Sequence, residues 1–219
     1  MNASFSLALA IALLALSSAL AHAAGDSGFL DDYSQLRPDP DRPGAMRYEA
    51  PGVNLGRYTK ILVTPIELLY APDSPHKNIS PDELKTITDA FYATLVDELE
   101  PAYPVVDRPG EDVLAVRIAI TGVRMENKKR PLLGYTPIGF AATTLANAAG
   151  LRVTLKSAGL EAELLDSVSG KPVGSVVDRG AGAAQIGGAT SWEQLGNTLK
   201  FYAQRFRARW DAARAHSGS

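Results

Sequence analysis

Long apolar segments in the middle of the chain predict the strands of a buried sheet. Residues 60–70 contain the run KILVTPI, which is rich in β-branched residues and typical of a buried strand. Residues 113–126 are apolar at many consecutive positions, so both faces of this segment are expected to be buried, as in a central strand. Residues 152–166 predict a third long strand, with a bulge near residues 157–159.

Two shorter strands are predicted beside these. Ser169 and Gly170 form a turn, after which residues 171–178 return along the third strand as a hairpin. A short strand is also expected over residues 103–107.

Two segments show the spacing of amphipathic helices. The first begins at Ser80, because Pro81 fits the first helical position and Glu83 completes a capping box. The second begins at Ser191, where Gln194 supplies the same capping pattern. The apolar stripes of the two helices are Leu84, Ile87, Phe91, Leu95 and Leu99, and Leu195, Leu199, Tyr202, Phe206 and Trp210. The order of elements predicts an α+β fold, with two long helices on one face of a mixed, largely antiparallel sheet.

The first 23 residues predict a signal peptide. The run from Phe5 to Ala21 is apolar, and Ala21 and Ala23 are small residues at the positions that a signal peptidase reads. An uncleaved membrane anchor is the alternative. The chain has no cysteine, so neither a lipid anchor on cysteine nor a disulfide partner is expected. These features predict an exported, periplasmic protein, and leave an association with a bacterial membrane open.

Residues 24–58 predict an N-terminal turn followed by a proline-rich arm, and residues 59–215 predict a single α+β domain. The turn carries an N-terminal docking motif, which consists of Phe29, Leu30, Asp31, Asp32 and Tyr33. We expect Phe29, Tyr33 and Leu36 to pack this turn onto the domain. The two aspartates then act as caps or turn formers, and a binding role for the motif is the alternative.

Composition and charge narrow the classes of function. Of the 219 residues, 46% are hydrophobic and 21% are charged, which is ordinary for a globular protein. The net charge of −2 and the isoelectric point of about 5.9 argue against nucleic-acid binding, because neutralising phosphates requires an excess of Lys and Arg.

Several blocks of sequence together resemble a bacterial envelope family known as domain of unknown function 3313. The blocks are FLDDYSQL, YTKILVTPI, LAVRIAIT, LEAELLDSVSGKPVGSVVD and the terminal helix with its Trp. The resemblance runs from about Phe29 to Trp210, and it implies an envelope protein of the lipoprotein type without a known activity. This chain departs from the family because it lacks the cysteine that a lipoprotein carries after its leader.

The best carboxylate cluster consists of Glu161, Glu163 and Asp166. Glu161 and Glu163 point to the same face of a strand, where they could bind a cation or raise one another's pKa. The alternative is a solvated or ion-paired strand face, with Arg117 or Arg152 as the partner. His76 and His216 have no second ligand at the spacing of a metal site. The sequence therefore predicts no catalytic site, no metal site and no cofactor.

Residues 131–151 carry no charge and follow three basic residues. Basic side chains beside an apolar segment suit a membrane surface or a groove on an envelope protein. The candidate interaction surface consists of Lys128, Lys129, Arg130, Leu132, Leu133, Tyr135, Ile138 and Phe140. The alternative is an internal crossover with a short Ala-rich helix that closes the core.

These observations predict a non-catalytic periplasmic cell-envelope protein that acts as an accessory or protein-binding module. The alternative is a domain that binds a small molecule or a lipid. A third hypothesis is a hydrolase that uses Glu161, Glu163 or Asp166.

Overall fold

The computed structural model describes residues 26–75, 77, 79–100, 102–127, 153–181 and 191–217. The chain divides into two compact units, Met1–Ser34 and Gln35–Ser219. No helix within the described ranges combines the length and the apolar character needed to cross a membrane.

In the first unit, a tight turn forms around the hydroxyl group of Tyr33. This oxygen accepts hydrogen bonds from the backbone amides of Phe29 and Leu30, each at 3.1 Å. Asp32 accepts a hydrogen bond of 2.7 Å from the backbone amide of Ser34, which is the geometry of an Asx turn. The docking of this turn onto the domain stays a prediction.

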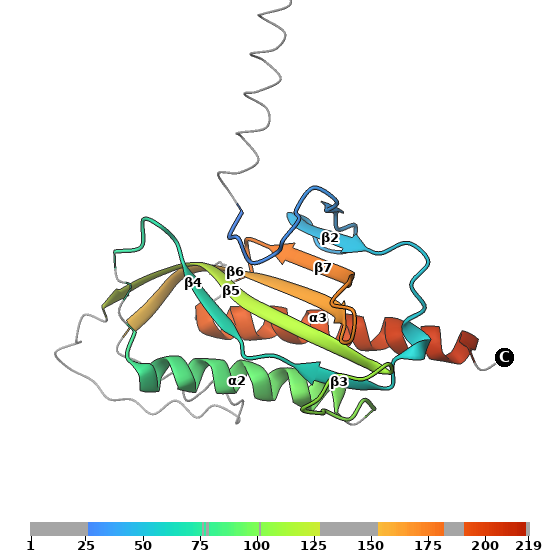
Figure 1. The fold of residues 1–219 in the computed structure, drawn as a ribbon. Helices are drawn as coiled ribbons and strands as arrows, with labels where there is room; N and C mark the ends of the chain where they lie inside the picture. Colours follow the sequence, from blue (N-terminus) through green and yellow to red (C-terminus); the bar gives the residue numbers. More distant parts are fainter. Residues whose placement is uncertain are drawn as a thin grey trace, which may run out of the picture. The chain divides into compact units, whose positions relative to one another are not determined.

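The second unit is a seven-stranded sheet covered on one face by two helices (Figure 1). The strands are β1 (Arg37–Pro38), β2 (Ala45–Glu49), β3 (Lys60–Val63), β4 (Glu67–Tyr70), β5 (Val113–Asn127), β6 (Val153–Asp166) and β7 (Pro172–Asp178). Their order is β1-β2-β7-β6-β5-β3, with β4 also paired to β5. Only β3 and β4 run parallel to their neighbour β5, and the other pairs are antiparallel. This confirms the predicted α+β fold.

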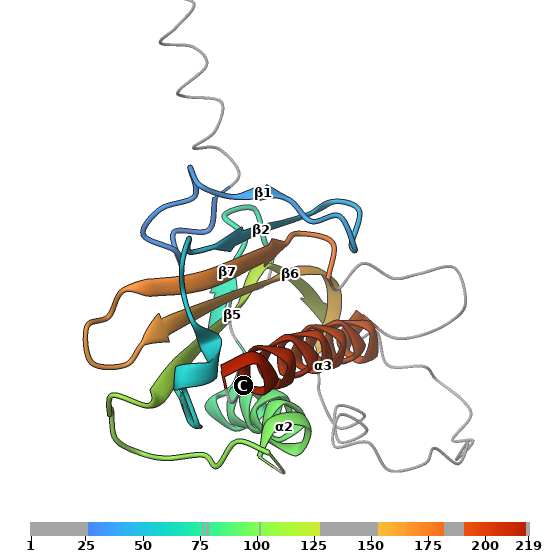
Figure 2. The same ribbon diagram turned by 90° about the vertical axis from the view of Figure 1, so that its right-hand side faces the viewer.

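The helices are α2 (Pro81–Leu99) and α3 (Ser191–Ser217), and a short 3-10 helix, η1, spans Leu55–Arg57. Figure 2 shows α2 and α3 side by side on the same side of the sheet. The predicted capping box of α2 is confirmed, because Ser80 Oγ accepts from the amide of Glu83 while the Glu83 carboxylate accepts from the amide of Ser80. Capping removes two unsatisfied amide donors and so fixes the start of the helix.

Trp210 anchors α3 in the core. Its side chain is fully buried, its ring stacks on Tyr103 with centroids 3.6 Å apart, and its Nε1 donates to the backbone carbonyl of Tyr58 at 3.0 Å. The predicted stripe of α3 is confirmed at Leu195, Leu199 and Trp210, which are buried. Tyr202 and Phe206 are only partly buried.

The strand predictions differ from the structure in two places. Residues 60–70 form two strands instead of one, because Pro65 lies between them and has no amide to donate to a ladder. At the predicted bulge both strands are irregular: Lys156 is an extra residue on β6 between the pairs Arg124–Ser157 and Met125–Leu155, and β5 has an irregularity that was not predicted. Gly122 and Val123 together oppose the single residue Ala158, and the positive φ of Gly122 (58°) is a conformation that glycine adopts without strain.

Two further segments were not described correctly by their sequence pattern. Residues 103–107 contribute only an isolated bridge between Ile61 and Val105. The proline-rich region contains β2, which pairs along its whole length with β7. The short β1 is the outer strand of that sheet edge, which suits Pro38, since an outer strand tolerates a missing amide.

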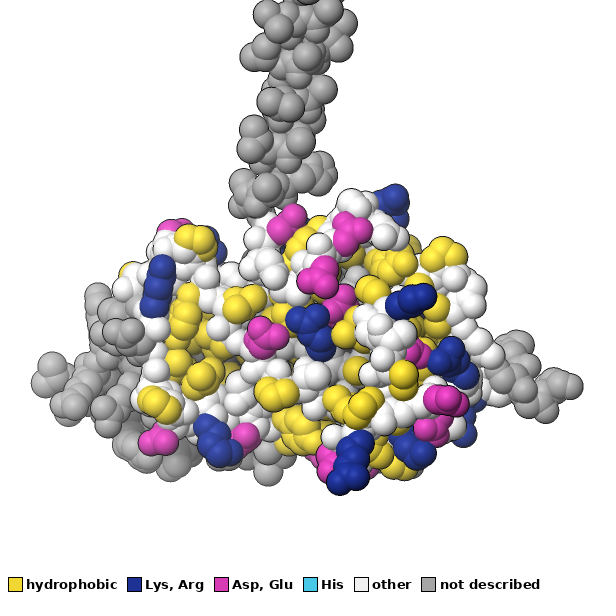
Figure 3. Space-filling model, in the orientation of Figure 1, with side chains coloured by type: hydrophobic (Ala, Val, Ile, Leu, Met, Phe, Trp, Pro, Cys, Tyr) yellow, Lys and Arg dark blue, Asp and Glu magenta, His cyan; other side chains and the backbone are white. Residues whose placement is uncertain are grey.

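On the face of the molecule shown in Figure 3, side chains of both charge signs are interspersed among apolar ones. Neither sign forms a continuous patch there.

Candidate functional site

A pocket of about 290 Å³ lies between α3 and the helix-facing side of β2, β7 and β6. Its floor is apolar and is formed by α2, α3 and the three central strands. The floor residues are Leu95, Leu99, Val116, Ile118, Leu160, Ala162, Leu164, Val173, Val176, Leu199, Ala203 and Phe206. The volume is close to the lower end of the range for small-molecule pockets.

Small side chains explain why space remains there. Ala162 on β6 and Ala203 on α3 both line the pocket, from the two layers that face each other. Larger residues such as Leu164 and Leu199 lie on the same strand and the same helix. Since protein interiors are normally packed with few voids larger than a water molecule, the two alanines leave room that the neighbouring leucines would fill.

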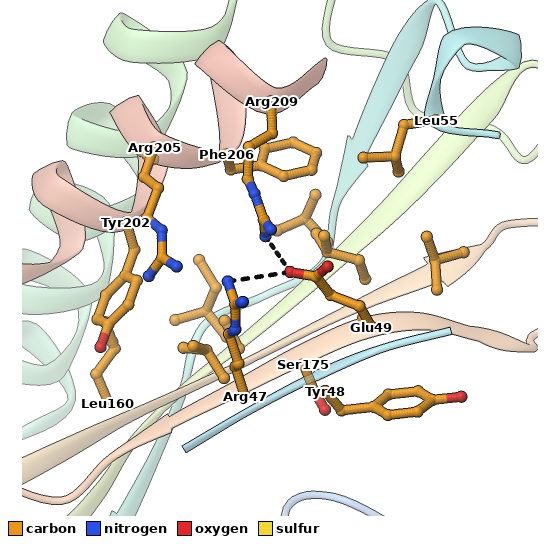
Figure 4. Close-up of a pocket in the computed structure, with 18 of the residues that line it drawn as sticks. Arg47, Tyr48, Glu49, Leu55, Leu160, Ser175, Tyr202, Arg205, Phe206 and Arg209 are labelled. Carbon is orange, nitrogen blue, oxygen red and sulfur yellow. Dashed lines mark hydrogen bonds and ion pairs between the residues drawn. The ribbon is translucent and has the colours of Figure 1, made fainter. Parts of the chain in front are cut away.

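The rim of the pocket carries charged residues from β2 and α3 (Figure 4). Arg47 and Glu49 are two residues apart on β2 and therefore point to the same face. Arg205 and Arg209 are four residues apart on α3, which places them on one side of the helix. Val53 and Leu55 add apolar surface at the rim, and Val53 is exposed.

One carboxylate joins the two sides of the rim. Glu49 Oε1 accepts from Arg209 Nη1 across the pocket, and it also pairs with Arg47 Nη1 at 3.3 Å. The dashed lines in Figure 4 mark these two interactions. All three side chains reach solvent, with 26% of Arg47, 50% of Glu49 and 44% of Arg209 exposed. We call these three residues the Glu49 clamp; it holds two positive charges and one negative charge.

Arg205 is held in a more buried arrangement. It pairs with Asp39 and, at 2.6 Å, with Asp41. Burial alone would raise the pKa of Asp39, but the hydrogen bonds from Arg205 and from the backbone amide of Asp41 lower this pKa below its usual value. Asp39 is therefore charged at neutral pH, and Arg205 is ion-paired with two carboxylates.

Asp178, at the end of β7, links Arg42 to the pocket residue Tyr202. Its Oδ2 accepts from Arg42 Nε and, at 3.1 Å, from the hydroxyl of Tyr202. Burial, and then the negative charge of Asp178, raise the pKa of Tyr202 above its usual value. Tyr202 therefore stays neutral and acts as a hydrogen-bond donor. Arg42 also donates to Thr198 on α3 at 3.1 Å, so this network ties the β1–β2 turn to the helix.

The predicted carboxylate cluster lies on a different surface. Leu160, Ala162 and Leu164 line the pocket, so the alternate residues Glu161 and Glu163 lie on the opposite face of β6. Glu163 pairs with Arg117 at 2.7 Å, which is one of the two partners that the sequence suggested.

Asp166, the third member, has its own partners. It accepts hydrogen bonds from Arg57, Tyr58 and Ser169. Hydrogen bonds from the backbone amide and the hydroxyl of Ser169, together with Tyr58 and the charge of Arg57, lower the pKa of Asp166 to about 2. Among the described residues, no group of three or more His, Cys, Asp or Glu side chains is placed to hold a metal ion.

The candidate interaction surface from Lys128 to Phe140 lies outside the described residues.

The pocket was not predicted from the sequence. A signal was present in α3, where Arg205 and Arg209 border Phe206 and Ala203 interrupts a row of larger apolar residues. The partner Glu49 could not be found in this way, because it lies 160 residues away in the proline-rich region.

The model of a sequence family described as "Protein of unknown function (DUF3313)" matches residues 25–206. The chain belongs to this family. Uncharacterized lipoprotein YdcL of Escherichia coli (strain K12) is 28% identical to this DUF3313 protein over 158 residues, which is 71% of each chain. YdcL is described as uncharacterized, so the similarity to it carries no statement about an activity.

Two solved structures are similar in outline to this DUF3313 protein. The PelC dodecamer from Paraburkholderia phytofirmans has 11% identity and a TM-score of 0.36, over 73% of this chain and 94% of PelC. A DUF4136 family protein from Bacteroides thetaiotaomicron has 9% identity and a TM-score of 0.38, over 82% of this chain and 98% of the other. With both TM-scores below 0.5, these proteins say nothing about what the DUF3313 protein binds.

Proposed function

We propose that this DUF3313 protein is a non-catalytic periplasmic protein of the bacterial cell envelope that binds a small molecule with an apolar body in the pocket under α3. The pocket is the observation that carries the proposal. The pocket of about 290 Å³ is open to solvent at its charged rim and is lined mostly by apolar residues, which matches the concave, mostly apolar character of small-molecule sites.

Two further observations support this function. The relative YdcL is named a lipoprotein, which favours an envelope location for this chain as well. The carboxylates that would serve a hydrolase are engaged elsewhere, because Glu163 pairs with Arg117 and Asp166 with Arg57. The second observation favours a binding role over a catalytic one.

The test fills the pocket from one side. Ala203→Phe places a ring in the cavity, whereas Ala208→Phe adds the same ring to an exposed position of the same helix. The probe is N-phenyl-1-naphthylamine, an uncharged fluorophore whose emission rises in apolar surroundings. We expect the wild type and Ala208→Phe to bind this probe. Ala203→Phe should bind it at least about tenfold more weakly, because the new ring occupies space in which the probe would otherwise bury apolar surface, and burial of an apolar group of this size is worth about 1.5–3 kcal/mol.

Overpacking can also unfold a domain. Circular dichroism must therefore show that Ala203→Phe is folded, and the smaller change Ala162→Val provides a second, milder filling of the same pocket. Unchanged probe binding in both folded variants, or no binding by the wild type, would reject this function.

A further inference from the structure

We infer that the pocket selects a fatty acid, and that the carboxylate of this ligand replaces the Glu49 carboxylate between Arg47 and Arg209. This inference rests on the proposed function, because it names the ligand class of the same pocket. It is carried by three properties of the Glu49 clamp, namely its hydrogen-bond donors, its exposure and its place among the residues that line the apolar pocket.

The hydrogen-bond donors of the clamp suit a second carboxylate. Arg47 and Arg209 each pair with the same oxygen of Glu49 through a single nitrogen, and Arg47 also interacts electrostatically with Asp39, so the clamp carries more N–H donors than its one carboxylate uses. The guanidinium group presents several donors in a planar fork that matches a carboxylate through two parallel hydrogen bonds. A second carboxylate therefore finds donors there that Glu49 does not fully use.

The exposure of the clamp makes exchange feasible. Half of the Glu49 side chain reaches solvent, so the carboxylate can leave the arginines and remain hydrated. Arg205 provides the contrast within the same rim, since its side chain is only 17% exposed and its partner Asp39 is completely buried. The clamp is thus the exchangeable ion pair of the rim, and the Arg205 pairs hold the fold.

The position of the clamp defines the shape of the ligand. Figure 4 shows the clamp spanning the gap between β2 and α3, with Phe206 on the helix side. Leu160 and Leu199 belong to the apolar floor of the same pocket. A ligand whose headgroup lies between the two arginines must continue as an apolar chain into the pocket, and the group that it replaces is itself a carboxylate on a flexible chain.

The experiment compares decanoate with 1-decanol by isothermal titration calorimetry or by displacement of N-phenyl-1-naphthylamine. We expect decanoate to bind about tenfold more tightly than 1-decanol, as one charge-assisted hydrogen bond implies. Arg47→Gln and Arg209→Gln should each remove most of this preference, while 1-decanol binding stays unchanged. Arg108→Gln, at an exposed loop position, is the matched control.

The variant Glu49→Gln tests whether Glu49 competes with the ligand for the two arginines or only connects β2 to α3. If Glu49 competes with the ligand, this variant binds decanoate several-fold more tightly than the wild type. Weaker binding of decanoate by folded Glu49→Gln would overturn the exchange.

The remaining outcomes are distinguishable. Failure of both decanoate and 1-decanol to bind rejects the proposed function itself. Equal binding of the two ligands keeps the pocket but overturns the inference. Tighter binding of decyl phosphate than of decanoate, with the same dependence on the two arginines, overturns the assignment to a fatty acid in favour of a phosphate headgroup.

Discussion

Asp166 offers a quantitative test of the hydrogen-bond network at the end of β6. Its Oδ1 accepts from the amide and the hydroxyl of Ser169 at 2.8 and 2.7 Å, and its Oδ2 accepts from Arg57 and Tyr58 at 2.7 and 3.1 Å. All four bonds favour the charged carboxylate, and the pKa of Asp166 falls from 3.8 to about 2.

The lowered pKa converts into a stability that depends on pH. A shift of nearly two pKa units corresponds to at most about 2.5 kcal/mol, and the exposure of the Arg57 side chain reduces this to roughly 1–2 kcal/mol. Because the folded pKa lies below the unfolded one, this stability is fully present above about pH 4 and is lost as the pH falls toward about 2.

The perturbation is Asp166→Asn. The amide removes the charge and turns one acceptor into a donor that faces other donors, so we expect the free energy of unfolding at neutral pH to fall by about 2 kcal/mol. The assay is urea denaturation of the wild type and the variant at neutral pH, near pH 4 and near pH 2. The difference between the two proteins should shrink between the last two conditions.

Asp107→Asn, at an exposed loop position, is the control and should leave the pH dependence of the wild type unchanged. A difference between Asp166→Asn and the wild type that stays constant from neutral pH to pH 2 would refute the reasoning, since it would mean that the carboxylate charge contributes nothing.

Two other predictions concern packing and interaction. Gly159→Ala should destabilise the domain by about 1–3 kcal/mol in urea denaturation, because its Cβ would lie 2.9 Å from Thr121 Oγ1 and 3.1 Å from the carbonyl oxygen of Asp178. Gly180→Ala, whose Cβ meets only Asp178 Oδ1 at 3.6 Å, is the control and should be nearly neutral; equal effects would contradict this account. A photo-crosslinking amino acid at Phe140 should yield a discrete higher-mass adduct in cells if the candidate interaction surface docks on an envelope protein. Adduct-free or internally linked monomer would instead favour the internal crossover.

The sequence was most informative where structure depends on local signals. The start of α2 follows from Ser80 and Glu83, which lie within one turn, and the β6–β7 hairpin follows from Ser169 and Gly170. The buried stripes of both helices were also predictable, because residues three and four apart share one face of a helix.

The errors arise where a distant partner decides the structure. The segment Ala45–Glu49 is short, partly polar and bordered by prolines, and it becomes a strand because β7 offers it an unpaired edge. The pocket also depends on residues that are distant from one another in the sequence. Ala203 stands out within α3, but its counterpart Ala162 does not stand out within β6, and the two line one pocket only because the helix packs on the sheet.

The Glu49 clamp joins two segments that are 160 residues apart. Contacts of such long sequence separation form late, since the entropy of closing a long loop opposes them until the intervening elements have packed. The central sheet can therefore assemble before the rim exists, whereas the rim requires β2 and the second half of α3 together. Under the proposed function, ligand binding would therefore require complete folding, because a chain with a native sheet and an undocked α3 lacks the assembled Glu49 clamp.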